Sequence, residues 1–212
     1  MINVLYIHGM GGGGDSRIPS ILRTAFDDKG VNIVVRTYDF DPEKAHVQIS
    51  RWVSELSPSL VIGESLGSIH ALRIKGVPHI LISPSLNAPF FLGYLSWLAL
   101  IPGVTALFDR IYKPREGDRQ PLHFKFTTLR KYLPHGKAAL AHSIRSGSND
   151  AFFAFFGTRD HYRKYGIVSV RKWKKYFGDD SAVIYEGTHF TEEEHIHSLI
   201  IPKIANMLGI NE

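Results

Sequence analysis

The sequence predicts an α/β protein in which a mostly parallel sheet has helices on both faces. The main observation is that short apolar or β-branched runs alternate with segments whose apolar residues recur at helical spacing, through residues 2–83 and again through 151–209. Strands that alternate with helices are typical of parallel sheets. The second observation is size. A chain of 212 residues, 44% of them hydrophobic, is long enough for one domain with a sizeable core.

In the first half, the runs that we interpret as strands are residues 2–8, 31–38, 60–63 and 78–83. Between the first two strands, apolar residues recur at helical spacing from Ile18, and Gly30 follows them where a C-terminal cap belongs. The next helix is expected to begin near Pro42, because proline is favoured in the first helical turn. A third helix is expected between Ser65 and Gly76.

The same alternation returns near the end of the chain. The strands expected there are residues 151–156 and 182–185. The helix between them carries its apolar residues on one face, over residues 170–177. The last helix should begin near Glu192, since Thr191 and Glu194 have the spacing of a capping box. Pro202 should kink or restart that helix, because proline cannot continue the backbone hydrogen bonds.

Residues 84–150 lack this rhythm and contain six prolines. We interpret them as a cap or lid inserted in a single domain of residues 1–212. Within it, residues 86–108 carry no charged side chain, which is compatible with a mobile apolar lid, a buried core helix or a membrane span. Interrupting Pro and Gly residues disfavour the span, and no transmembrane segment is expected. We expect four aromatic residues of the stretch to bind substrate: Phe90, Phe91, Tyr94 and Trp97.

The charge of the chain is unevenly distributed. The net charge is +5, and residues 110–145 hold nine Lys and Arg against two acidic residues. A solvated face is the simplest interpretation, and the alternative is attraction for an anionic substrate, a membrane surface or nucleic acid. No nucleic-acid-binding motif accompanies these charges, so no nucleic-acid partner is expected. The absence of cysteine excludes disulfides, a thiolate nucleophile and thiolate metal sites.

The most informative motif is Gly63-Glu64-Ser65-Leu66-Gly67, which lies between an expected strand and an expected helix. A G-x-S-x-G sequence at such a turn is the nucleophile elbow, in which the serine hydroxyl stands clear of the sheet. Glycine is needed two positions before and after the serine because the turn leaves no room for side chains there. Ser65 is therefore the candidate nucleophile.

A serine hydroxyl needs a general base, and the base needs an orienting carboxylate. In this arrangement the three residues follow one another in the order Ser, Asp or Glu, His. Asp160 follows the strand expected at 151–156, and His189 follows the one at 182–185. Both lie at carboxyl ends of strands, where open α/β sheets build their sites. The rivals are weaker, because Asp179 and Asp180 precede a strand and His161 adjoins Asp160.

Two backbone N–H groups should complete the site by stabilising the oxyanion of a tetrahedral intermediate. One should come from Leu66, directly after the nucleophile. The other should come from the glycine-rich loop after the first strand, where little side chain separates the backbone from a substrate, and Met10 is the candidate. No metal ligand is assigned.

His8-Gly9, the elbow and the loops that carry Asp160 and His189 together resemble an α/β-hydrolase, of the small bacterial esterase-like kind that lacks extra N-terminal strands. The resemblance covers most of residues 1–83 and 151–209. It implies hydrolysis of an ester, thioester or amide through an acyl-serine, with a small-molecule substrate and no cofactor. It also implies that residues 84–150 form the variable cap.

Two other functions stay open. Residues 9–14 also match G-x-G-x-x-G after a strand, with Asp39 at the end of the next strand, which is the fingerprint of a dinucleotide-binding protein. That interpretation leaves Ser65, Asp160 and His189 without a role. A catalytically silent hydrolase fold used as a binding module is the third possibility. No signal peptide is recognisable, so we expect a cytoplasmic location.

Overall fold

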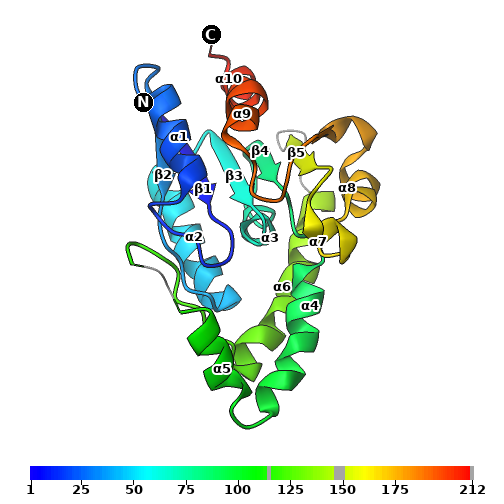
Figure 1. Ribbon diagram of the computed structural model, residues 1–212. Helices are drawn as coiled ribbons and strands as arrows, with labels where there is room; N and C mark the ends of the chain where they lie inside the picture. The colour runs from blue at the N-terminus through cyan, green and yellow to red at the C-terminus, as the bar shows by residue number, and fades with distance from the viewer. Residues whose placement is uncertain (114–115, 146–150, 211–212) are drawn as a thin grey trace.

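A six-stranded, all-parallel sheet forms the centre of the computed structural model, which describes residues 1–113, 116–145 and 151–210 (Figure 1). The strand order is β2-β1-β3-β4-β5-β6, and every neighbouring pair is parallel. The strands are β1 (Ile2–Ile7), β2 (Val31–Val35), β3 (Leu60–Glu64), β4 (His79–Ile82), β5 (Phe152–Gly157) and β6 (Ala182–Tyr185). The predicted α/β class with a parallel sheet is confirmed.

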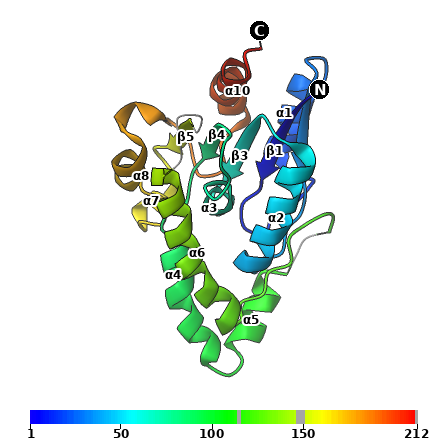
Figure 2. The ribbon, with the colours of Figure 1, turned by 180° about the vertical axis from the view of Figure 1, so that it is seen from behind.

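Helices bury both faces of this sheet, which explains why its strands are apolar runs rather than alternating patterns. In β1, Val4 and Tyr6 pack in one cluster, while Leu5 and Ile7 belong to a second cluster on the opposite face. The first face is covered by α1 (Arg17–Phe26) and α10 (Ile201–Leu208). The second is covered by helices that include α2 (Pro42–Leu56) and α8 (Val170–Phe177) (Figures 1 and 2).

The chain between β4 and β5 leaves the sheet as a helical arm, which we define as residues 88–145. It consists of α4 (Ala88–Leu95), the 3-10 helix η1 (Ser96–Leu100), α5 (Val104–Ile111) and α6 (Phe126–Arg145). α4 runs along α6 in close contact. The two helices approach so closely at Gly93 that a Cβ there would overlap the side chain of Leu133. The two helices extend away from the sheet, and the turn between α4 and α5 is the point furthest from it (Figures 1 and 2).

The charge-free stretch of residues 86–108 therefore forms several short helical segments. Among the described residues, no helix is both long and apolar enough to cross a membrane. The alternative of a buried core helix is wrong for most of the stretch, because Tyr94 and Trp97 are more than half exposed. Leu92 and Ser96, on the side facing α6, are buried. Whether the arm opens and closes as a lid stays a prediction.

The C-terminal helix differs from the sequence-based expectation at its N-terminus. It begins as α9 (Glu193–His195), continues as a π-helical turn η3 (Ile196–Ile200) and restarts as α10, with Pro202 in the first turn of the restarted helix. The predicted restart at Pro202 is confirmed. The predicted capping box is wrong, because the Thr191 hydroxyl bonds the Tyr185 hydroxyl instead of the helix N-terminus.

Candidate active site

Ser65 occupies the turn between β3 and α3 (Gly67–Ala71), with a φ of +48°. This left-handed conformation is strained for a residue with a side chain and is characteristic of functional turns. The flanking glycines make it possible. A Cβ on Gly67 would overlap the carbonyl oxygens of Ile7 and His8, and one on Gly63 would lie 2.8 Å from the Ala71 Cβ. The motif therefore folds as its sequence predicts.

The structure brings Ser65, Asp160 and His189 into one hydrogen-bonded chain. His189 Nε2 lies 2.9 Å from Ser65 Oγ, and His189 Nδ1 lies 2.8 Å from Asp160 Oδ2. Because a carboxylate can only accept, Nδ1 carries the proton and Nε2 is left free to accept one from the serine. Asp160 and His189 are 3% and 4% exposed, so the bond between them is shielded from water.

Asp160 is held in place by the helix that follows it. It is the N-cap of α7 (His161–Lys164), and its Oδ1 accepts a hydrogen bond of 2.8 Å from the Tyr162 amide. One carboxylate oxygen thus caps the helix while the other receives His189 Nδ1–H. The Tyr162 ring packs edge-on against the His189 imidazole at 4.5 Å between centroids, which fixes the ring plane.

The rival residues lie elsewhere. Asp179 and Asp180 form a 3-10 turn, η2 (Asp179–Ser181), on the amino-terminal side of β6, and both are exposed. His161 lies 6.1 Å from His189 between ring centroids and is exposed. The parallel sheet explains the difference, because residues that follow β3, β5 and β6 meet at one edge while residues that precede a strand end at the other.

The two residues whose amides are expected to bind an oxyanion lie at the same cavity as Ser65 and His189. Met10 and Leu66 both line that cavity. Among the described residues, neither backbone N–H has a hydrogen-bond partner. Leu66 stands at the start of α3, where a helix leaves its first amides unpaired. Two unpaired donors beside a serine hydroxyl are what an oxyanion hole requires.

The glycine loop of residues 9–14 uses its other amides within the protein. The N–H groups of residues 11–14 donate in turn to Gln120, Gly9, Ser16 and Asp118. The Asp118 backbone and carboxylate also approach so closely that a Cβ on Gly13 or Gly14 would overlap them. The loop therefore offers no set of free amides to a pyrophosphate, and an acidic side chain lies against it. Asp39 pairs with Lys44. These contacts leave the dinucleotide interpretation without structural support.

Gln120, which the sequence pattern did not single out, clamps this loop from the arm side. Its side chain accepts from the Gly11 amide at 3.0 Å and donates to the Tyr38 carbonyl at 3.1 Å, while its own amide donates to the Gly12 carbonyl at 2.7 Å. It is 1% exposed. The clamp fixes the backbone just after Met10. No sequence signal marks it, because the contact joins segments more than 100 residues apart.

Ser85 adjoins the nucleophile, and His8 adjoins the glycine loop. Ser85 Oγ lies 3.2 Å from Ser65 Oγ and is buried. His8 donates from Nδ1 to the Gly9 carbonyl at 2.8 Å and stacks on the Tyr38 ring at 4.3 Å. Burial lowers the pKa of His8 to about 4, so the ring is neutral at pH 7. His8 therefore braces the glycine loop without placing a positive charge beside the triad.

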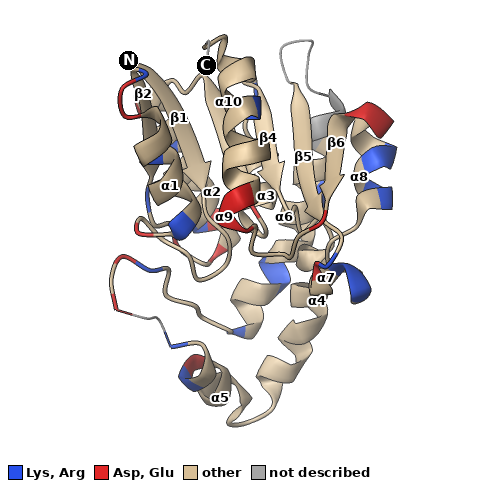
Figure 3. Cartoon of the chain, turned by 45° about the horizontal axis from the view of Figure 1, so that its top comes forward, with Lys and Arg blue, Asp and Glu red and all other residues tan. Residues whose placement is uncertain are grey.

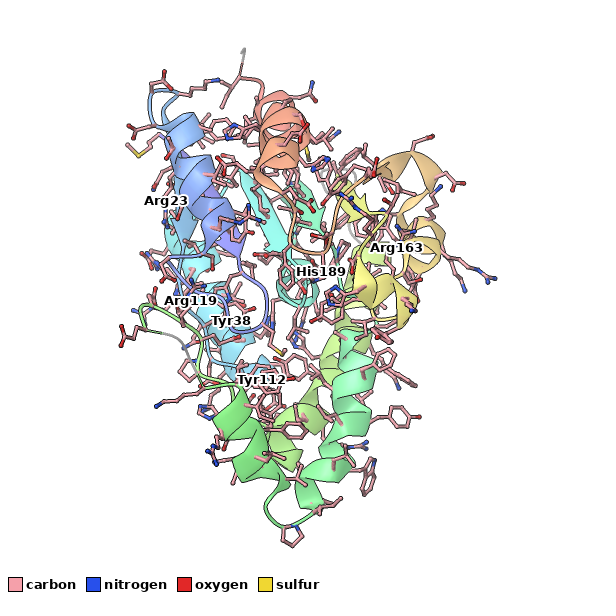
Figure 4. The ribbon with its side chains drawn as sticks, viewed as in Figure 1. Arg23, Tyr38, Tyr112, Arg119, Arg163 and His189 are labelled. Atoms are coloured by element: carbon pink, nitrogen blue, oxygen red, sulfur yellow. The ribbon has the colours of Figure 1, made fainter. Side chains whose placement is uncertain are left out.

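A cavity of about 770 Å³ opens in front of the triad, between the sheet edge and the arm. The arm contributes an apolar wall: Phe91, Leu92, Ile111, Tyr112 and Leu122. Tyr112 of the arm and His189 of the sheet edge both line this cavity, and Figure 4 labels both side chains. Of the four aromatic residues expected to bind substrate, only Phe91 lines the cavity. The expectation for Phe90, Tyr94 and Trp97 is not met, because these side chains are exposed and lie outside its lining.

Solved structures with the same architecture cover nearly the whole chain. A monoacylglycerol lipase from Paleococcus ferrophilus aligns over 97% of this chain and 94% of its own, at 17% identity and a TM-score of 0.65. Est1E from Butyrivibrio proteoclasticus, solved with ferulic acid bound, aligns over 99% and 90%, at 13% identity and a TM-score of 0.66. The chain has the α/β-hydrolase fold.

The similarity extends to an animal protein. The α/β-hydrolase domain-containing protein 10 from mouse aligns over 98% of this chain and 89% of its own, at 13% identity and a TM-score of 0.65. No protein-family model and no curated protein sequence matches the chain. At these identities the α/β-hydrolase fold is what the comparisons establish, and the chemistry has to be argued from the site.

Proposed function

We propose that this protein is a serine hydrolase that cleaves carboxylic esters through an acyl-serine intermediate. The observation that carries the proposal is the continuous hydrogen-bonded chain from Asp160 through His189 to Ser65 Oγ, at 2.8 and 2.9 Å. A serine in a strained turn, a histidine whose Nε2 faces the serine hydroxyl and a buried carboxylate form the arrangement that activates a hydroxyl nucleophile. A binding module would not need this geometry.

The reaction follows from the positions of the donors and acceptors. Ser65 Oγ attacks the ester carbonyl carbon while its proton passes to His189 Nε2, and Asp160 stabilises the imidazolium that forms. The carbonyl oxygen becomes an oxyanion that accepts from the Met10 and Leu66 amides. His189 returns the proton to the leaving alcohol oxygen, which releases the alcohol. A water molecule then hydrolyses the acyl-serine with His189 again as the base.

The cavity favours an ester with an apolar acyl part. Phe91, Leu92 and Ile111 of the arm lie across the cavity from the catalytic loops. Each additional buried methylene is worth about 0.8 kcal/mol, or roughly fourfold in kcat/KM. We therefore expect kcat/KM for p-nitrophenyl esters to rise from acetate through the medium-chain acids. A maximum at acetate would show that the apolar wall does not receive the acyl chain. Thioesters and amides are alternative substrates of the same mechanism.

Covalent labelling tests the nucleophile directly. A fluorophosphonate probe should phosphonylate the protein at Ser65, and mass spectrometry of the peptide should locate the adduct there. Ser65→Ala should abolish labelling and lower kcat by a factor on the order of 10⁶. Ser68→Ala is the matched control, because that buried hydroxyl is nearby but bonds the Gly63 carbonyl. An adduct on another residue, or none, would refute the proposal.

A further inference from the structure

The arm carries most of the exposed large apolar side chains of the described chain. Ten of them, each 40–62% exposed, belong to residues 90–112, which we call the apolar tip. They are Phe90, Phe91, Tyr94, Trp97, Leu98, Leu100, Ile101, Leu107, Ile111 and Tyr112. Soluble surfaces rarely gather so many, and such patches mark interaction sites. The segment that joins α4 to α5 is also the part of the molecule furthest from the sheet (Figures 1 and 2).

The charges around the apolar tip are mostly positive. Arg110, Lys113, Lys125 and Arg130 lie within or beside it, and all four side chains are exposed. Within residues 88–113 and 125–130, all of which the structure describes, Asp109 is the single acidic residue. The Arg130 guanidinium lies 5.5 Å from the centre of the Trp97 ring, which joins the cationic rim to the aromatic surface. Figure 3 shows α4 without charged residues and the charges gathered on α5 and the segments that follow.

This combination fits one kind of partner better than others. Protruding Trp, Tyr and aliphatic side chains bordered by Lys and Arg are typical of surfaces that dock in the headgroup region of anionic membranes. The tip is a projecting end of the molecule, which suits a deformable bilayer more than a shaped protein groove. Phe91, Ile111 and Tyr112 belong both to the tip and to the cavity wall, so the cavity reaches the same surface.

We propose that the apolar tip docks onto an anionic lipid bilayer and that the cavity in front of Ser65 opens towards this surface. The docking itself does not require catalysis. The consequence for the substrate, that esters would enter the cavity from the lipid phase, rests on the proposed hydrolase function. Docking and hydrolysis are therefore measured separately, so that failure of one is distinguishable from failure of the other.

Vesicle sedimentation tests the docking. The Ser65→Ala protein should bind phosphatidylcholine vesicles containing about 30% phosphatidylserine, and binding should weaken as salt rises to about 0.5 M. Leu100→Ser/Ile101→Ser should lower the partition coefficient by about tenfold or more, because two apolar side chains are lost from the interface. Arg110→Gln/Lys125→Gln should lower it roughly twenty-five-fold, at roughly fivefold per cation. Val47→Ser/Ile184→Ser is the matched control and should bind normally, since both residues are exposed but outside the arm.

Activity on a water-soluble ester separates the two proposals. Leu100→Ser/Ile101→Ser should hydrolyse p-nitrophenyl butyrate at the wild-type rate, because neither residue lines the cavity. The same variant should lose hydrolysis of an ester embedded in the anionic vesicles. Absence of vesicle binding by the folded protein would overturn the docking proposal, and so would equal binding by the tip and control variants. A dimer that dissociates in Leu100→Ser/Ile101→Ser without any vesicle binding would instead assign the tip to self-association.

Discussion

Replacing Asp160 with asparagine should separate its catalytic role from its structural one. Asp160 uses one oxygen to accept from His189 Nδ1 and the other to accept from the Tyr162 amide. An asparagine can keep its oxygen on the Tyr162 amide, and its NH₂ group then faces His189. Because NH₂ donates, Nδ1 must become the acceptor and the proton moves to Nε2. His189 then cannot take the proton of Ser65.

The expected magnitudes differ for activity and stability. The wrong tautomer should lower kcat by about 10⁴, which corresponds to about 5.4 kcal/mol. Stability should change little, because asparagine caps a helix as well as aspartate and satisfies Nδ1. Asp160→Ala should lower kcat similarly but also cost about 1 kcal/mol for the lost cap and about 2 kcal/mol for the unpaired Nδ1–H. The alanine variant should therefore melt about 6–12 °C lower.

The assays are kcat on a p-nitrophenyl ester and urea unfolding of each variant. Ser169→Ala is the matched control, since the Ser169 hydroxyl caps α8 by accepting from the Lys172 amide at 3.1 Å. It should lose about 1 kcal/mol of stability with kcat unchanged. An Asp160→Asn variant that retains kcat within tenfold of wild type would show that another group orients the base. Equal stability of the asparagine and alanine variants would refute the capping role.

Three further predictions concern the surroundings of the triad. Gln120→Met should lower kcat about tenfold with a smaller change in KM, because the oxyanion loop loses its clamp; an unchanged kcat would contradict this. Burial lowers the pKa of His8 to about 4 and of His135 to about 3, so the unfolded chain binds protons that the folded chain does not below about pH 6.5. As the pH falls to about 5, protonation of each histidine in the unfolded chain should lower the free energy of unfolding by about 2 kcal/mol, measured by urea unfolding. A free energy of unfolding that does not change with pH would contradict the burial argument. Gly67→Ala should reduce both folding stability and kcat, since its Cβ has no space beside the His8 carbonyl, and a wild-type melting curve would show that the turn can adapt.

The sheet and the positions of the site residues could be predicted because both depend on local signals. A parallel strand buried on both faces is a continuous apolar run, and β3 begins at Leu60, where its run does. Ser65, Asp160 and His189 each lie within four residues of the carboxyl end of a strand, so the sheet brings them to one edge. The strand after α1 shows the limit of this reasoning. It ends at Val35 rather than near Tyr38, whose hydroxyl turns away to donate to the His8 carbonyl.

The features that the sequence did not reveal all depend on contacts between distant segments. Thr191 and Glu194 have the spacing of a capping box, but the Thr191 hydroxyl finds Tyr185 instead. The apolar stretch of the arm predicted a lining for the pocket, and Phe91 and Leu92 line the cavity, but the helices place Trp97 on the outer surface against Arg130. For Thr191 and Trp97 the local pattern gave the correct chemistry of the side chain and the wrong partner, because tertiary packing chooses among partners.

The arm connects two parts of the proposed function that the sequence keeps separate. Its first helices carry the apolar tip, and its returning segment carries Asp118 and Gln120, which hold the glycine loop beside Met10. Asp118 also accepts from the Thr37 hydroxyl, so the returning segment is bound both to the glycine loop and to the segment after β2. The tip and the partners of the glycine loop therefore belong to one inserted segment, whose returning part is hydrogen-bonded to that loop. Gln120 forms two of these hydrogen bonds, to the Gly11 amide and the Gly12 carbonyl, so Gln120→Met tests directly whether the arm holds the backbone beside Met10.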